Sequence, residues 1–256
     1  MENRYLEQLS WPEAANALTE SACVVIPLGA QLKEHGHHLP LNTDWLLADY
    51  LTGQLSALQN LLITPPIGLS FFPAFTDYPG TVSLSKHCAG LMLEEYLQAL
   101  STHGARRFYF LNTGISTNWV LEPLRLKLQQ QHIEILYSDL LELLPDIEAP
   151  IAEQRCGSHA DEIETSMMLY IAPERVRMEL ACCEYGRDGK QSGPFRRQPE
   201  QNGFYSPSGI FGDATLATAE KGRVVLLQLA ERIRRQLRAF SQPGWHPAPP
   251  AERYLS

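Results

Sequence analysis

The feature that most constrains the fold is an alternation of short apolar runs with longer segments of helical periodicity. Continuous apolar runs lie at residues 23–28, 61–65, 107–112 and 133–137. Segments whose apolar residues recur at helical spacing follow them or lie between them, at residues 43–58, 85–102 and 119–131. Buried strands that alternate with helices are typical of a mostly parallel sheet between helical layers. We therefore predict an α/β fold with an α/β/α layered arrangement.

The rest of the chain is less regular. A helix is expected from Ser10 to about Thr19, because Ser10 and Glu13 have the spacing of a capping box. Further expected elements are a helix over 161–171, a long loop over 186–212 that is a candidate lid or subunit contact, and a helix over 213–240. Without an internal repeat or a break in composition, we expect one domain of residues 1–256. Its core is expected at about 10–240, followed by an extended tail at 241–256.

Charge and cysteine content exclude several functional classes. The 256 residues include 21 Lys and Arg against 29 Asp and Glu, which gives a formal charge of −8. Such an acidic chain is not expected to bind nucleic acid or an anionic membrane surface. It has neither an apolar run of membrane-spanning length nor a signal-peptide pattern at its start. The cysteine count of five is odd and includes no CxxC pair, which favours reduced thiols and a cytoplasmic location.

The segment from Gly29 to Asp44 contains the residues most suited to chemistry. It follows an apolar run and precedes a helical segment, so it lies at the sheet edge where α/β proteins bind ligands. Three histidines lie within it, together with Glu34 and Asp44, and Gly36 allows the backbone to turn so that flanking side chains converge. Imidazole nitrogens and carboxylate oxygens are ligands of Zn²⁺ and Mn²⁺. A solvated polar loop is the alternative interpretation of this segment.

Five motifs, in this order, resemble those of the creatininase family, the creatinine amidohydrolases. The first is the segment 29–44, with its H-G and P-L-x-T-D elements. The others are Tyr78–Leu84, His103–Asn112, His159–Ser166 and Ala217–Gly222. The resemblance covers roughly residues 10–240. It implies the layered α/β fold and a metal-dependent hydrolase that cleaves a C–N bond in a small cyclic or linear amide.

The resemblance also implies roles for individual residues. His35 and Asp44 match metal-ligand positions of the family, and Glu34 is a further candidate ligand next to the position where the family has its first Glu. His159 would carry protons to the leaving nitrogen, and Glu164 would act beside it or bind the metal. The implied cofactor is Zn²⁺ or Mn²⁺. The implied partners are a small-molecule substrate and further copies of the chain in a homo-oligomer, for which a hexamer is common in the family.

Two departures from the family pattern qualify this expectation. Lys33 stands where the family has its first Glu ligand, and the segment 112–118 contains neither the His nor the Glu that the family contributes to a two-metal centre. One ion is therefore expected rather than two. Two alternatives remain: a divergent enzyme that uses one metal or none on another small polar substrate, and an inactive protein that binds small molecules. A separate alternative for Asp161, Glu162 and Glu164 is that these carboxylates only favour the start of a helix.

Overall fold

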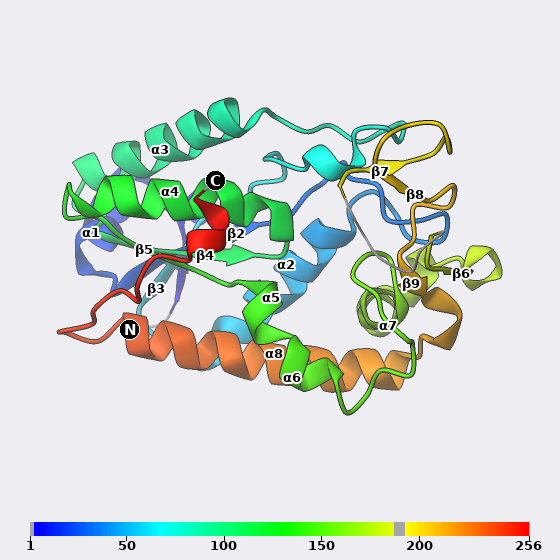
Figure 1. Ribbon diagram of the computed structural model, residues 1–256. Helices are drawn as coiled ribbons and strands as arrows, with labels where there is room; N and C mark the ends of the chain where they lie inside the picture. Colours follow the sequence, from blue (N-terminus) through cyan, green and yellow to red (C-terminus); the bar gives the residue numbers. More distant parts are fainter. Residues whose placement is uncertain (1–2, 187–192, 256) are drawn as a thin grey trace.

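The computed structural model describes residues 3–186 and 193–255. Its centre is a five-stranded parallel sheet with the strand order β1-β3-β2-β4-β5. The strands are β1 (Arg4–Tyr5), β2 (Cys23–Leu28), β3 (Leu61–Ile63), β4 (Arg107–Asn112) and β5 (Glu134–Tyr137). The four apolar runs of the sequence correspond to β2 to β5. The short edge strand β1 has no apolar run and was not predicted. The predicted layered α/β fold is confirmed (Figure 1).

Helices cover both faces of this sheet (Figure 1). One layer consists of α1 (Trp11–Glu20), α3 (Lys86–Thr102) and α4 (Asn118–Gln129). The opposite layer consists of α2 (Thr43–Gly53), α7 (Glu162–Ile171) and α8 (Ala219–Phe240). Two single-turn helices, α5 (Leu140–Leu143) and α6 (Pro145–Glu148), follow β5.

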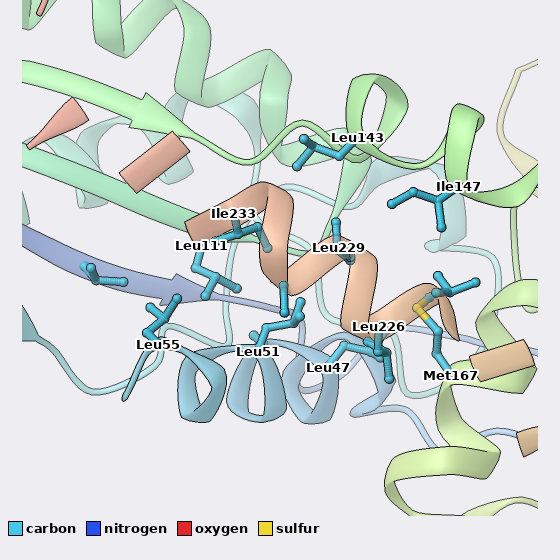
Figure 2. Close-up of a cluster of buried hydrophobic side chains, with 14 of the residues drawn as sticks. Leu47, Leu51, Leu55, Leu111, Leu143, Ile147, Met167, Leu226, Leu229 and Ile233 are labelled. Carbon is cyan, nitrogen blue, oxygen red and sulfur yellow. The ribbon is translucent and has the colours of Figure 1, made fainter. Parts of the chain in front are cut away.

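Alternate residues of the strands serve the two layers. In β2, Val24 and Ile26 pack with α1, α3 and α4, whereas Cys23 and Val25 pack with α2 and α8. Figure 2 shows the second cluster, in which Leu111 of β4 lies near Leu51 of α2 and Ile233 of α8, while Met167 of α7 lies at the far end beyond Leu226. Burial on both faces explains why these strands are apolar throughout rather than alternating.

The strand order places a topological switch point between β2 and β4. From β2 the chain passes to β3 on one side, and β4 and β5 lie on the other side. The loops that follow β2 and β4 therefore leave neighbouring carboxyl ends and diverge, which opens a crevice between them. In parallel sheets this crevice is the usual place for a ligand. Here it lies between the segments 29–42 and 113–117.

Two helix boundaries differ from the sequence prediction. The helix expected over 43–58 ends at Gly53 and continues as a 3-10 turn over Gln54–Ala57. The helix expected over 213–240 starts only at Ala219, because Thr218 caps it: its Oγ1 accepts a hydrogen bond from the backbone N of Lys221 at 3.2 Å. The residues Gly212–Asp213 form a strand, β9, that pairs with β6 (Cys183–Glu184).

The expected long loop and extended tail also have more structure than predicted. Part of the loop over 186–212 lies outside the described residues, but β7 (Phe195–Arg196) and β8 (Phe204–Tyr205) pair within it. The tail returns to the body in a 3-10 turn over Glu252–Tyr254, and Tyr254 is fully buried. Within the described residues no helix has the length and apolar character to span a membrane.

Candidate metal site and cavity

The loop after β2 folds back so that its charged residues lie inside the protein. Gly36 has a φ of 71°, and a Cβ there would lie 2.9 Å from Nδ1 of His38, so only glycine suits this turn. The backbone N of Lys33 donates to the carbonyl of Leu41 at 3.0 Å, which closes the loop across the turn. As a result Lys33, Glu34, His35 and Asp44 are all buried, His35 and Asp44 completely.

The imidazole of His35 is oriented by hydrogen bonds at both of its nitrogens. Its Nδ1 lies 2.8 Å from the carbonyl oxygen of Lys33, which can only accept, so Nδ1 carries a hydrogen. Its Nε2 faces two carboxylates, with Oδ1 of Asp44 at 3.0 Å and Oε1 of Glu164 at 3.7 Å. Three potential acceptors that face one another require a cation among them, either a proton on Nε2 or a metal ion.

His159 is oriented in a similar way. Its Nε2 lies 2.9 Å from Oε2 of Glu34, and its Nδ1 lies 3.8 Å from Oε2 of Glu164. Because the carboxylate of Glu34 accepts a hydrogen at Nε2, the lone pair of Nδ1 faces Glu164. Glu34 reaches this position because residue 209 is a glycine: a Cβ there would lie 1.9 Å from Oε1 of Glu34. Glu34 thus contacts His159 rather than the imidazole of its neighbour His35.

Glu164 connects the two imidazoles. It lies in the first turn of α7, which Asp161 caps by accepting hydrogen bonds from the backbone N of Ile163 and of Glu164. Before this cap, Ala160 has a φ of 48°, a conformation that L residues seldom adopt. Its backbone N donates to Oε2 of Glu164 at 2.6 Å and holds the carboxylate in place. Within the described residues, potential ligand atoms of His35, His159 and Glu164 lie within 4.8 Å of one another.

Lys33 occupies the far side of Asp44. Its Nζ lies 2.7 Å from Oδ2 of Asp44, and both side chains are buried. Burial alone would raise the pKa of Asp44, but the charges of Lys33 and His35 outweigh burial and hold the pKa well below its usual value. Asp44 is therefore a carboxylate whose Oδ2 contacts the ammonium of Lys33 and whose Oδ1 contacts the imidazole of His35.

The donor set fits one divalent ion better than two. Glu34, Asp44 and Glu164 supply three carboxylates, and the single ammonium of Lys33 leaves two negative charges when the imidazoles are neutral. One divalent ion near His35 would neutralise them. A second ion would have to bind Oδ2 of Asp44. The ammonium of Lys33 already contacts this oxygen and would repel the ion.

The other two histidines of the loop lie outside this cluster. His38 is buried and its Nε2 lies 2.7 Å from Oγ1 of Thr165, and burial lowers the pKa of His38 to about 4. A neutral imidazole bonded to α7 fixes the loop against that helix. The backbone carbonyl of His37 accepts a hydrogen bond from Nη2 of Arg177 at 3.0 Å.

The segment after β4 is held by residues that sequence reasoning did not single out. Nδ2 of Asn112 donates to Oδ1 of Asn118 at 2.8 Å, and Nδ2 of Asn118 donates to the hydroxyl of Tyr254 at 3.1 Å. That hydroxyl donates to Oδ2 of Asp139 at 2.6 Å. Oγ1 of Thr113 donates to the backbone carbonyl of Asp44 at 2.8 Å, which joins this segment to the loop after β2.

A cavity of about 460 Å³ opens beside the cluster, within the size range of sites for small molecules. Lys33, His159 and Glu164 line its polar end. Phe75 packs on His159 with ring centroids 4.1 Å apart, and Phe195 of β7 packs edge-on at 5.4 Å. The long loop expected as a lid therefore contributes an aromatic side chain that covers the proposed proton carrier.

Comparisons with known proteins agree with this fold and with the sequence motifs. The family model for Creatininase, described as creatinine amidohydrolase, matches residues 7–237. A mycofactocin precursor peptide peptidase of Mycolicibacterium smegmatis is 26% identical over 222 residues, which cover 83% of this chain and 84% of that protein. The creatinine amidohydrolase of Pseudomonas putida is 23% identical over 241 residues, 87% of this chain and 91% of that protein.

Solved structures give the same result for the fold. The manganese form of creatininase superposes with a TM-score of 0.78 at 21% identity and covers 93% of this chain and 99% of its own. The low identity fits a divergent member of the family. Because the family model spans nearly the whole chain, the protein belongs to the creatininase family of amidohydrolases, as a divergent member.

Proposed function

We propose that the protein is a hydrolase that binds one Zn²⁺ or Mn²⁺ ion and cleaves the C–N bond of a cyclic or linear amide. The observation that carries the proposal is that Nε2 of His35 faces two carboxylates, Asp44 at 3.0 Å and Glu164 at 3.7 Å, an arrangement that requires a cation. These three side chains would hold the ion. When bound, it would acidify a water molecule and polarise the substrate carbonyl.

The residues around that centre have separate tasks in this proposal. His159 accepts a proton at Nδ1 and delivers it to the leaving nitrogen, while Glu34 holds the opposite nitrogen and stabilises the imidazolium that forms. Glu164, fixed by the backbone N of Ala160, faces both imidazoles, with Oε1 3.7 Å from Nε2 of His35 and Oε2 3.8 Å from Nδ1 of His159. Phe75 and Phe195 exclude water from the ring of His159, which strengthens its pairing with Glu34.

The test combines metal counting with turnover of an amide panel that includes creatinine, other cyclic amides and short linear amides. We expect about one ion per chain after loading with Zn²⁺ or Mn²⁺ and removal of the excess. His159→Gln should keep the ion and lose at least ~100-fold in turnover, because the proton carrier is gone. His246→Ala, at an exposed histidine, is the control. A chain that takes up no ion, or that hydrolyses no amide when loaded, contradicts the proposal and favours an inactive binding protein.

We also propose that the chain forms a homo-oligomer in the cytoplasm. Leu32 and Val82 are exposed and lie next to each other, since the backbone N of Val82 donates to the carbonyl of Leu32 at 2.9 Å. Adjacent exposed apolar side chains favour a subunit contact. The free thiols of the described cysteines fit a reducing compartment. Light scattering at micromolar concentration should give a multiple of the chain mass, and a monomer mass would reject the assembly.

A further inference from the structure

Lys33 is a buried cation that the proposed proton transfers do not use. Only 6% of the residue is exposed, and burying an ammonium costs several kcal/mol unless its hydrogens find partners. Among residues 3–186 and 193–255, the carboxylate paired with its Nζ is that of Asp44. An ammonium has three hydrogens, so this pair leaves donors for another acceptor.

The surroundings of Lys33 place those donors at the cavity. Lys33 lines the cavity together with His159 and Glu164, and its Nζ lies 5.2 Å from the ring centroid of Phe75, another lining residue. The ammonium and the imidazole of His159 thus lie beside the same aromatic ring, on the polar end of one cavity. A carbonyl oxygen bound to Lys33 would have its carbon and nitrogen within reach of the groups proposed to cleave the bond.

The rest of the cavity wall is mostly apolar. Single-turn helices after β5 and the helices α4 and α7 supply the apolar residues Trp119, Leu140, Leu141, Leu144, Pro145 and Met167, and Glu148 and Asp161 also line the cavity. Leu47 and Met167 belong both to this wall and to the core cluster of Figure 2, so the wall is continuous with rigidly packed core. A mostly apolar cavity that a buried cation also lines fits a molecule with an acyl chain rather than a polar ring alone.

We propose that Lys33 binds the acyl oxygen of the substrate and that the substrate class is an amide of an apolar carboxylic acid. This deepens the proposed function and rests on it for the reaction. Water adds to the carbonyl carbon, the C–N bond breaks, and His159 passes the water proton to the amine that leaves. Throughout, Lys33 keeps its proton and donates hydrogen bonds, first to the carbonyl oxygen, then to the oxyanion and finally to the product carboxylate.

The test uses metal-free protein and neutral primary amides, so that neither an ion nor overall charge contributes to binding. An NMR titration compares propanamide, butanamide, pentanamide and hexanamide. In the wild-type protein we expect affinity to rise roughly fourfold with each added methylene, because each one buries apolar surface against the cavity wall. An affinity that does not depend on chain length, or no binding of hexanamide, overturns the assignment of the substrate class.

Two substitutions then test the residue itself. Lys33→Met should weaken hexanamide binding about tenfold, as expected for the loss of a hydrogen bond from a charged donor. Lys33→Arg keeps a donor and should retain most of the affinity, and Lys127→Met removes an exposed ammonium as the matched control. Equal binding by wild type and a folded Lys33→Met protein overturns the role of Lys33. Because no metal is present, this result is separate from failure of the metal site.

Discussion

The loops after β2 and β4 leave adjacent strands at the same sheet edge, yet they differ in what they contribute. The loop over 29–42 brings buried charges together, and its contacts are ion pairs and imidazole hydrogen bonds. The segment over 113–117 contributes hydroxyls and backbone; of the amides that flank it, Asn112 donates to Asn118, and Asn118 donates to the buried Tyr254. Neighbouring positions in one fold therefore do not imply equal roles: one loop supplies chemistry, and the other shapes the cavity wall.

The strongest way to break this contrast is to remove the ligands of the first loop. His35→Ala together with Asp44→Ala should abolish metal retention, because two of the three proposed ligands are lost and the charge that attracts the ion falls. Metal analysis after dialysis gives the count. The matched control combines His246→Ala with Asp49→Ala, both exposed. If the first double variant is folded and still carries a full equivalent of ion, the proposed ligand set is wrong.

The contrast can also be reversed by giving the second loop a ligand. A Cβ at Gly114 would lie 3.4 Å from Oγ1 of Thr117 and 3.7 Å from Oδ2 of Asp44, both ordinary contacts, so a side chain can start there without a clash at Cβ. Lys33→Glu with Gly114→His should raise the metal count from about one to about two per chain, since the ammonium is replaced by a ligand and an imidazole is added. Each single substitution is its own control. A count that stays at one shows that more than Lys33 excludes the second ion.

A smaller effect is expected from the anchor of the second loop. Tyr254→Phe removes the hydroxyl that bonds to Oδ2 of Asp139 and to Nδ2 of Asn118, and should lower the free energy of unfolding by about 1–3 kcal/mol. Urea denaturation measures this, with Tyr5→Phe at the exposed edge strand as the control. Metal binding at His35 should not change. A Tyr254→Phe protein with unaltered stability would show that the tail does not hold this part of the site.

The smallest effect compares two carboxyl groups near the same site. Lys33 holds the pKa of Asp44 low, whereas burial, aided by the charges of Asp161 and Glu164, raises the pKa of Glu148 to about 7. A carboxyl whose pKa is raised on folding stabilises the protein in its protonated form, so that contribution is lost as pH rises from about 4.5 to about 7.

Between pH 5 and pH 8, the metal-free wild type should therefore lose about 1–2 kcal/mol more unfolding free energy than Glu148→Gln, after allowance for solvent screening. Urea denaturation at the two pH values measures the difference, and Glu179→Gln, at an exposed glutamate, is the control. Parallel curves for wild type and Glu148→Gln would mean that Glu148 is solvated.

Much of the fold followed from local pattern. Strands β2 to β5 and the layered arrangement were predictable because burial on both faces demands runs such as Cys23–Leu28. The placement of the segment 29–44 at the functional edge followed from the same alternation. The start of the last helix at Ala219 was missed because Gly212–Asp213 pairs instead with Cys183–Glu184, which is distant in the sequence; the cap at Thr218 is local and could have been identified.

The sequence by itself determined the fold class and the family motifs, because these depend on which residues follow one another. Only the tertiary structure decided what those residues contact. Glu34 bonds to His159, Lys33 pairs with Asp44, and Tyr254 anchors the segment after β4. Such contacts join residues far apart in the chain, and their strength depends on burial, which local sequence does not specify.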